Sequence, residues 1–344
     1  MKNKTALLAL LMVLLLLMSA CGFIIPGNIP DGALTVYFID VGQADSALVL
    51  CDGGAMLIDG GNVEDSSLLY AFLKEHNISH LDYIVATHAH EDHVGGLTGA
   101  LNYATVGIAL CPVTGYDSRA FGNFVKYLNE QGVEITVPRF DDTFKLGGAV
   151  VTVLAPVKPS DEPNNTSIVL HIKYGETTFL FTGDAEREEE ADILDMGYDI
   201  SSTVLKVGHH GSDTSTSYPF LREIMPEYAV ISCGTDNSYG HPHDGTMSRL
   251  RDADVTVFRT DMQGTITCVS DGVDVNFSTE RTAVSPTNPT AEVLPEEYYV
   301  GNRNSLKFHR SACSGLPQEK NSVIFNTRQE AETLGYAPCG ICKP

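Results

Sequence analysis

The pattern of hydrophobic and polar positions predicts an α/β domain over residues 33–278. Short apolar runs, several of them β-branched and separated by glycine-rich turns, are typical of strands. Mixed strands with interleaved helices predict an α/β sandwich that closes near Phe277. Strands are expected at 34–40, 47–51, 55–59, 81–86, 150–154, 167–173, 177–182, 203–207 and 227–232, and helices at 66–77, 121–131 and 186–196.

The composition changes after this domain. Residues 281–296 contain three prolines among Ser, Thr and Asn, which is typical of a linker. Residues 297–344 form a compact tail that holds three of the eight cysteines. Four of the others lie singly in strand-like segments and are expected to be buried free thiols, although an exported protein can pair some. These four are Cys51, Cys111, Cys233 and Cys268.

The first residues have the pattern of a lipoprotein signal peptide. Two lysines within the first four residues precede an apolar run at 6–18, and the run ends in Met18-Ser19-Ala20-Cys21. This pattern predicts a signal peptide over 1–20 and acylation of Cys21. The alternatives are a plain secretory signal and an uncleaved anchor. We therefore expect the mature protein on the outer face of the cytoplasmic membrane, anchored by lipid, or otherwise secreted.

The charge of the chain limits what it can bind. Forty-four acidic residues against 22 basic ones give a net charge of −22. This argues against nonspecific nucleic-acid binding through a broad basic face, because phosphate contacts need Lys and Arg. The acidic net charge does not exclude a metal site that binds a single phosphate group of its substrate.

Residues 87–96, with the sequence THAHEDHVGG, follow an apolar strand and contain a cluster of potential metal ligands. His88 and His90 are two residues apart, so in extended backbone their side chains point the same way. Asp92 and His93 follow in the turn and can aim at a second point nearby. Imidazole and carboxylate groups suit zinc, manganese or iron. A solvated loop is the alternative, but this spacing arises by chance in roughly one such chain in a thousand, so we favour a metal site.

Ligand-type residues also follow three other predicted strands. A two-metal site needs a bridging ligand, and carboxylate is the usual one. Asp184 is the candidate bridge, and its alternative is the N-cap of the helix that follows. The residues concerned are Asp184 after 177–182, His209 and His210 after 203–207, and His241 and His243 after 227–232.

Six sequence blocks, all in order, resemble the metallo-β-lactamase superfamily and, within it, the extracellular domain of ComEC-type competence proteins. The resemblance covers about residues 33–278. It implies an αββα sandwich in which a metal-bound hydroxide attacks an ester, amide or phosphodiester bond. The blocks are VGQADS (41–46), LIDGG (57–61), HAHEDHVGG (88–96), FTGDAE (181–186), KVGHHGS (206–212) and YGHPH (239–243).

The resemblance also implies how the ligands divide between two metals. It places Asp184 between them as a catalytic, bridging residue. His209 is a less favoured candidate ligand than its neighbour His210, because its side chain would point to the opposite side on an extended strand. The resemblance assigns the first metal to His88 and His90, the second to Asp92, His93 and His210, and the bridge to Asp184.

The sequence departs from the superfamily at the first metal. Many members have a further histidine before the bridging aspartate, whereas the only histidine here, His171, occupies an ordinary strand position. The ComEC-like branch instead shows an Asn-Asn-x-Ser patch, present at 164–167. Asn165 is therefore a candidate substrate or metal contact, and a plain turn after Pro163 is the alternative. A first site short of imidazole is open to water or substrate, weaker for zinc, or better suited to manganese.

The histidines of the last block offer a further function. An imidazole near the metals can protonate the leaving oxygen or hold a phosphate. His241 is assigned this catalytic role because the branch motif is matched there. The alternative is a loop histidine without a role, and His243 receives no assignment.

The tail has the spacing of a second metal site. His309 and Cys313 form H-x3-C, and Cys339 and Cys342 form C-x2-C, with 25 residues between the two motifs. This spacing suits a closed tetrahedral zinc site. The alternative is a disulfide between two of the three cysteines. Residues 299–339 also resemble the small zinc domain of Ada-type DNA repair proteins, with His309 in place of a cysteine, which implies a structural zinc and suggests DNA.

The sequence thus predicts a lipid-anchored extracellular hydrolase with two divalent metals, zinc or manganese, and one structural zinc. Its expected partners are a phosphodiester substrate, DNA foremost, and the membrane, through the lipid anchor. One alternative is hydrolysis of a small envelope phosphodiester of the phosphocholine-ester type, which the acidic charge favours. The other is a non-catalytic lipoprotein that binds DNA for uptake, against which the intact ligand set argues. β-Lactam hydrolysis has only the fold in its favour.

Overall fold

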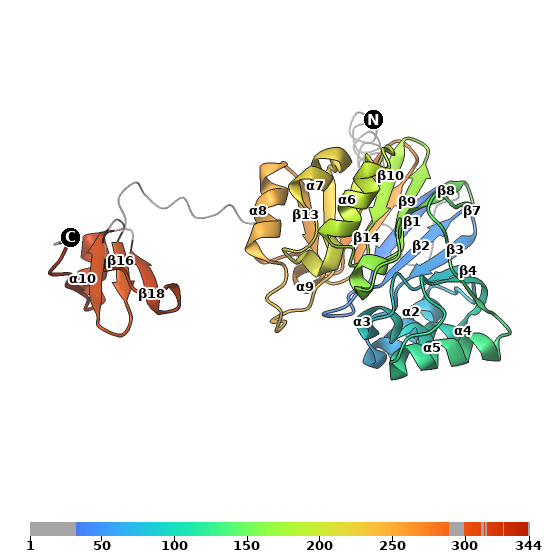
Figure 1. The fold of residues 1–344 in the computed structure, drawn as a ribbon, viewed down its shortest axis with the longest axis horizontal. Coiled ribbons are helices and arrows are strands. Elements are labelled where there is room, and N and C mark those ends of the chain that lie inside the picture. Colours follow the sequence, from blue (N-terminus) through green and yellow to red (C-terminus); the bar gives the residue numbers. More distant parts are fainter. Residues whose placement is uncertain (1–31, 289–298, 311–312, 314, 326, 343–344) are drawn as a thin grey trace, which may run out of the picture. The chain divides into compact units, whose positions relative to one another are not determined.

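The computed structural model describes residues 32–288, 299–310, 313, 315–325 and 327–342 (Figure 1). The chain divides into two compact units, Met1–Asn288 and Pro289–Pro344. The predicted signal peptide, Cys21 and residues 289–296 of the predicted linker lie outside the described residues. Among the residues that the structure describes, no helix is both long and apolar enough to cross a bilayer.

The first unit contains two large sheets that pack face to face. In the first sheet, the strand pairs β3–β4 and β4–β5 are parallel, and the first strand, β1, pairs with β14 from the end of the unit. The spatial order is β15 (Val275–Thr279), β14 (Ile266–Ser270), β1 (Leu34–Phe38), β2 (Ala47–Cys51), β3 (Gly54–Ile58), β4 (His80–Val85), β5 (Thr105–Leu110) and β6 (Ile135–Thr136).

The second sheet is parallel over the four strands that matter for the site, β10 to β13. Its remaining strands are antiparallel hairpins. The spatial order is β13 (Thr256–Arg259), β12 (Tyr228–Ile231), β11 (Val204–Lys206), β10 (Thr177–Phe181), β9 (Val169–Tyr174), β8 (Ala149–Ala155) and β7 (Thr143–Leu146).

Helices cover the outer face of each sheet (Figure 1). One outer core packs helices α2, α4 and α5 on the first sheet, and another packs α6, α7 and α8 on the second. A third core lies between the sheets, where the rings of Phe38 and Phe181 stack with centroids 5.8 Å apart. The predicted αββα sandwich is thereby confirmed. The helices are α2 (Ser66–Glu75), α3 (Glu91–Val94), α4 (Leu97–Tyr103), α5 (Arg119–Glu130), α6 (Arg187–Asp195), α7 (Tyr218–Ile224), α8 (Asp244–Asp252) and α9 (Thr260–Gln263).

The predicted elements are all present, with ends shifted by no more than two residues; the strand expected at 167–173, for example, begins at Val169. Strands β5, β13 and β14 and helices α7 and α8 were not predicted from the sequence. The four cysteines expected in strand-like segments are buried free thiols, as predicted.

The described part of the predicted linker is held on the first unit. Arg281 Nη2 lies 3.1 Å from Asp40 Oδ2, at the end of β1. Further on, Thr287 Oγ1 donates to a carbonyl of β13 (2.6 Å), and Asn288 Nδ2 donates to a carbonyl of α8 (3.2 Å). Residues 281–288 are therefore attached to the first unit by side-chain contacts and belong to it.

The second unit is a small sheet with one helix. Few side chains are fully buried in the part of this unit that the structure describes: Phe308, Phe325 and Ala331. A hydrophobic core of this size stabilises the unit only weakly, so a bound metal would add to its stability. The strand order is β18 (Ser322–Phe325), β16 (Tyr299–Asn302), β17 (Lys307–Arg310) and β19 (Ala337–Pro338), and the helix is α10 (Arg328–Thr333).

Candidate metal centre

Three strands of the two sheets deliver the predicted ligands to one place. The carboxyl ends of parallel strands meet at the same edge of a sheet, so residues that follow them come together. The loop after β4 carries His88, His90, Asp92 and His93, the loop after β10 carries Asp184, and the loop after β11 carries His209 and His210.

The ligands predicted for the second metal converge. The ligand atoms of Asp92, His93, Asp184 and His210 all lie within 4.8 Å of one another. His93 Nε2 is 3.3 Å from Asp184 Oδ2, and His210 Nε2 is 3.2 Å from Asp92 Oδ2. A cation among these four groups would have two imidazole and two carboxylate ligands, which suits zinc or manganese.

The ligands predicted for the first metal lie beside this set. His88 Nε2 is 3.0 Å from His90 Nδ1, so the two rings point to one place. His88 Nε2 is also 3.9 Å from Asp184 Oδ2. The carboxylate of Asp184 therefore lies next to both sets, which is the position a bridging ligand requires.

Two buried atoms of the site are without hydrogen bonds. Asp184 Oδ1 and His93 Nε2 have no hydrogen-bond partner in the described part of the chain. Both residues are almost completely inaccessible to solvent. Burying such groups unsatisfied is costly, and a divalent cation would satisfy both. The residues present therefore fit a metal.

The charges of the site favour a bound cation. Burial disfavours the charged form of His210, but the carboxylates of Asp184 and Asp45 raise its pKa to about 10. Burial likewise opposes ionisation of Asp92, but His93 and His210 lower its pKa to about 2. The carboxylates thus favour the protonated forms of His93 and His210, and a cation that binds there would displace those protons.

Residues behind the ligands orient the imidazoles. Asp59 Oδ2 accepts from His93 Nδ1 at 2.8 Å, and Thr87 donates to Asp59 through both its backbone N–H and its hydroxyl. These contacts direct His93 Nε2 toward Asp184. The sequence analysis quoted Asp59 in a motif but assigned it no role; its place at the end of β3 was the available signal.

A buried ion pair orients His210 in the same way. His210 Nδ1 donates to Ser232 O at 3.1 Å and lies 3.3 Å from Asp45 Oδ1. The other oxygen of Asp45 accepts from Lys206 Nζ at 2.8 Å. Lys206 and its neighbours lower the pKa of Asp45 despite its burial, so the carboxylate stays ionised behind the imidazole. Asp45 and Lys206 both lie in sequence blocks quoted above, but neither was assigned a role from the sequence.

The prediction for His209 was wrong because it assumed an extended backbone at this residue. The strand β11 ends at Lys206, and His209 and His210 lie in a left-handed turn with φ of 48° and 53°. Because the backbone is not extended there, their rings do not point to opposite sides. His209 Nε2 lies 3.7 Å from Asp184 Oδ2, as does His210 Nε2.

The N-cap alternative for Asp184 is also wrong. Helix α6 begins at Arg187 and its N-cap is Glu186, not Asp184. Gly183 takes a φ of +50°, and a side chain there would come within 2.9 Å of Thr87 Cβ. Gly183 thus lets the chain turn tightly after β10 and bring Asp184 to the ligands.

A cavity of about 350 Å³ opens above these ligands. Asn165 does not line it; its Oδ1 accepts from the backbone N–H of Glu186 at 2.9 Å in a 3-10 turn, Pro163–Thr166. Its neighbour Asn164 faces the cavity instead. The predicted Asn patch is therefore a turn with one side chain available to a ligand. The lining residues are Gln43, His90, Glu91, Asp92, Asn164, Asp184, His209, His210, Tyr239 and His241.

The two histidines after β12 have different surroundings. Burial and the neighbouring imidazoles lower the pKa of His241 to about 4, so its ring is neutral near pH 7. A neutral ring favours holding a phosphate over protonating a leaving group. His243 does not line the cavity, and both of its ring nitrogens are engaged: Nδ1 accepts from Asp213 N at 3.0 Å, and Nε2 donates to Tyr239 O at 3.1 Å. These two hydrogen bonds stabilise the loop.

The predicted ligands of the tail also come together. The ligand atoms of His309, Cys313, Cys339 and Cys342 lie within 4.8 Å of one another, and the three cysteines are not disulfide-bonded. Backbone N–H groups donate to each sulfur at 3.4 Å. Such donors stabilise thiolates, the form that binds zinc. This cluster is compatible with a closed zinc site.

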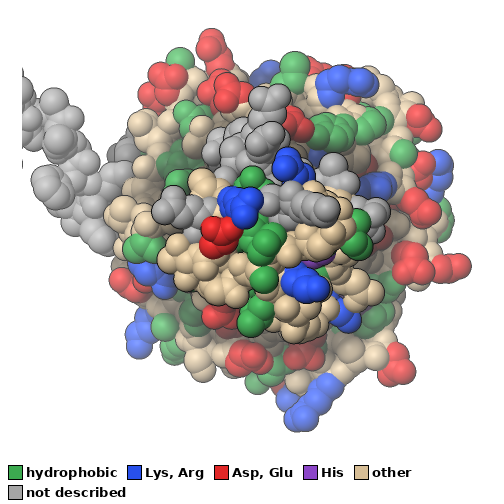
Figure 2. Space-filling model, turned by 90° about the vertical axis from the view of Figure 1, so that its left-hand side faces the viewer, with side chains coloured by type: hydrophobic (Ala, Val, Ile, Leu, Met, Phe, Trp, Pro, Cys, Tyr) green, Lys and Arg blue, Asp and Glu red, His purple; other side chains and the backbone are tan. Residues whose placement is uncertain are grey.

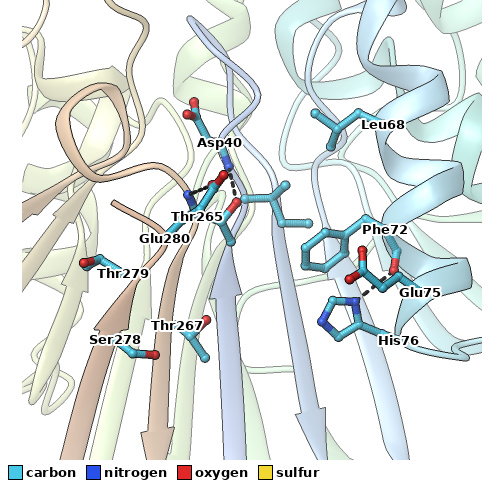
Figure 3. A pocket seen from close by; sticks show the side chains of 11 residues that line it. Asp40, Leu68, Phe72, Glu75, His76, Thr265, Thr267, Ser278, Thr279 and Glu280 are labelled. Carbon is cyan, nitrogen blue, oxygen red and sulfur yellow. Dashed lines mark hydrogen bonds between the residues drawn. The ribbon is translucent and has the colours of Figure 1, made fainter. Parts of the chain in front are cut away.

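Another cavity, of about 590 Å³, lies between α2 and the edge of the first sheet (Figure 3). Its polar groups serve the fold. Asp40 N donates to Thr265 Oγ1 at 3.2 Å, and Thr265 N donates to Glu280 Oε2 at 3.0 Å. None of the metal-ligand clusters among the described residues lies in this cavity.

Comparison with known proteins agrees with this geometry. Residues 39–235 match the metallo-beta-lactamase superfamily, and residues 283–344 match the metal binding domain of Ada. ComE operon protein 3 of Bacillus subtilis is 33% identical over 263 residues, which cover 71% of this chain and 34% of that protein. Competence protein ComA of Neisseria gonorrhoeae is 30% identical over 244 residues, which cover 70% of this chain and 33% of that protein. The chain thus spans about a third of the length of these relatives.

A solved structure, the metallo-beta-lactamase fold protein YhfI of Bacillus subtilis, aligns with 69% of this chain and 99% of its own at 13% identity and a TM-score of 0.46. The fold and the ligand set define a metal-dependent hydrolase. The chain belongs to the metallo-beta-lactamase superfamily, whose match covers more than half of its length. Its resemblance to the ComEC-type branch and to the Ada zinc domain is confirmed as well.

Proposed function

We propose that the protein is a dinuclear metal-dependent phosphodiesterase that cleaves DNA outside the cytoplasmic membrane. The observation that carries this proposal is the placement of Asp184, whose carboxylate lies within 4 Å of His88, His93 and His210 at the floor of one cavity. Two ligand sets around one buried carboxylate are the arrangement that two-metal hydrolases need.

The metals, zinc or manganese, would lower the pKa of a bound water and so supply the nucleophile. The protein's own residues do the rest. His88, His90 and Asp184 would hold one ion, and Asp92, His93, Asp184 and His210 would hold the other. His241 and His209, at the cavity wall, offer N–H groups to the anionic oxygens of a phosphate.

The second unit supports DNA as the substrate. Residues 297–344 contain six Lys and Arg against four Asp and Glu, whereas the whole chain carries a net charge of −22. Arg303, Lys307 and Arg310 are exposed on the β16–β17 hairpin or beside it. On the face shown in Figure 2, Lys and Arg side chains stand singly among acidic and other side chains. DNA would therefore be held by a few phosphate contacts, and not by a broad basic face.

The relatives support the same substrate. One is named a competence protein and the other a ComE operon protein, and the tail matches the metal binding domain of Ada. A small envelope phosphodiester of the phosphocholine-ester type is the second candidate, because the acidic charge of the chain disfavours a polyanion.

A substrate panel separates the two candidates. The mature chain, loaded with Zn²⁺ or Mn²⁺, should cleave single-stranded or duplex DNA and bis-p-nitrophenyl phosphate. Replacing Arg303, Lys307 and Arg310 together by Ala should raise the KM for DNA roughly 10–100-fold at low salt by removing phosphate contacts. The same variant should leave bis-p-nitrophenyl phosphate cleavage unchanged, which makes that substrate the internal control. Cleavage of a phosphocholine ester without any cleavage of DNA would reject DNA in favour of the second candidate.

The place of action follows from Cys21, which we propose is acylated and anchors the protein to the outer face of the membrane. A clickable fatty acid supplied to the cells should then label the wild-type chain and not Cys21→Ser, while cleavage activity per molecule stays the same. In-gel fluorescence after the click reaction measures this. A wild-type chain that takes up no label would favour a plain secretory signal or an uncleaved anchor.

A further inference from the structure

Gln43 lies in the loop after β1 and faces the cavity above the metal ligands. The loop is held in place by neighbours from distant parts of the chain. Asn62 Nδ2 donates to the backbone carbonyl of Gln43 at 3.3 Å. Gly234, after β12, packs so closely that a side chain there would come within 2.7 Å of Gln43 N. The backbone of Gln43 is therefore fixed relative to the loop that carries His241.

The side-chain amide of Gln43 can point only one way. Its Oε1 accepts from the backbone N–H of Gly234 at 3.1 Å. A backbone N–H only donates, so the atom facing it has to be the oxygen. The amide nitrogen Nε2 then faces the other neighbour, His241 Nδ1, at 3.2 Å.

The orientation of this amide decides which nitrogen of His241 carries the proton. An amide –NH₂ group donates and does not accept, so Nδ1 has to be the unprotonated nitrogen. The hydrogen of the neutral ring then sits on Nε2. Nε2 has no hydrogen-bond partner in the described part of the chain. Its N–H is available to a ligand in the cavity.

The ring itself is held in one position. The side chain of Asn237 makes two hydrogen bonds to the backbone of His241: its Oδ1 accepts from His241 N at 3.0 Å, and its Nδ2 donates to His241 O at 2.6 Å. The ring of Tyr239 stacks on the imidazole with centroids 5.6 Å apart and an interplanar angle of 21°. A ring fixed in this way presents its free N–H in a constant direction.

We propose that Gln43 is a positioning residue that locks His241 in the Nε2–H tautomer, so that His241 donates a hydrogen bond to a non-bridging oxygen of the bound phosphate. The phosphate contact rests on the proposed function. The tautomer does not, because it follows from the contacts of Gly234, Gln43 and His241 alone.

The test replaces the amide by a carboxylate of nearly the same shape. In Gln43→Glu, one oxygen still accepts from Gly234 N–H, but the other faces His241 Nδ1 and can only accept. Nδ1 then has to carry a proton. In Gln43→Met, a matched side chain without hydrogen-bonding groups, neither tautomer is favoured by residue 43.

The tautomer is read by long-range ¹H–¹⁵N correlation on the zinc-loaded full chain with labelled histidine, and the His241→Ala variant assigns the ring. We expect wild type to show a protonated Nε2 and an unprotonated Nδ1, Gln43→Glu to show a protonated Nδ1, and Gln43→Met to show a mixture. The zinc content should be equal in all three. Cleavage of DNA should fall about 10–100-fold in kcat/KM for Gln43→Glu and less for Gln43→Met, as for other residues that orient a catalytic imidazole.

The outcomes separate this inference from the proposed function. A protonated Nδ1 in wild type, or the same tautomer in wild type and Gln43→Glu, would overturn the role of Gln43 whatever the activity. A changed tautomer with unchanged cleavage of DNA would overturn the phosphate contact. If wild type shows the expected tautomer but cleaves no phosphodiester, the proposed function fails together with the phosphate contact, and the tautomer lock stands.

Discussion

Asp184→Ala should strip the first unit of its metals and abolish turnover. The carboxylate lies within 4 Å of His88, His93 and His210, so its loss removes a ligand from both sets at once. It also removes one of the two carboxylates that lie within 4 Å of both His93 and His210, the other being Asp92. Metals supply several kcal/mol of transition-state stabilisation, so we expect a loss of about 10³-fold or more in kcat/KM. Elemental analysis and the rate of bis-p-nitrophenyl phosphate cleavage measure the two effects.

A neighbouring acidic residue provides the control for Asp184. Glu188 is exposed on α6, four residues further along the chain. Glu188→Ala removes the same charge from the same segment and should leave metal content and rate unchanged. The zinc of the tail should survive in both variants. Unchanged metal content of the first unit in Asp184→Ala would remove Asp184 from the site, and since the residue is not the N-cap of α6, it would be left without a role.

The second unit should unfold when its metal is removed. Among the described residues of this unit, the fully buried side chains are only Phe308, Phe325 and Ala331, a core too small to offset the loss of chain entropy. Zinc bound by His309 and the three tail cysteines would supply the missing free energy, about 10–16 kcal/mol in comparable zinc peptides. Residues 297–344 expressed alone should therefore show dispersed NMR signals and a cooperative melt with zinc and neither with a chelator.

Two variants sharpen this result. Cys339→Ser removes one ligand and should leave the isolated tail unfolded even with zinc, whereas Ser305→Ala, at an exposed turn residue, should fold normally. A melt that persists in chelator, together with a Cys–Cys link in mass spectrometry, would replace zinc by a disulfide.

The ligands were predictable because they follow strands directly. His88 and His90 stand at the end of β4, and Asp184 stands at the end of β10. The apolar run identifies each strand, and the carboxyl ends of parallel strands share one edge. Prediction failed for His209 because it assumed that the strand continued. The pattern of apolar residues does not indicate the left-handed turn at His209 and His210, because the turn differs from a strand in its backbone φ angles and not in hydrophobicity.

The residues behind the ligands were not predictable from local pattern. Asp45 and Lys206 are 161 residues apart in sequence, yet they form a buried ion pair. Gln43 meets Gly234 across 191 residues. Such contacts depend on how the two sheets pack. The pairing of β1 with β14, which brings the start of the unit next to its end, has the same origin, so the order of the strands was not accessible either.

The proposed function is tested most directly by metal titration of a cleavage reaction. The mature chain is stripped of its metals, the tail zinc is restored, and Mn²⁺ or Zn²⁺ is added in steps while cleavage of a labelled DNA strand is followed. We expect no cleavage at the start, and a rise that is complete only when the ligand sets around Asp184 are both filled. Rapid cleavage of DNA by the stripped protein in excess chelator, or a fully loaded protein that cleaves no phosphodiester, would contradict a dinuclear metal phosphodiesterase.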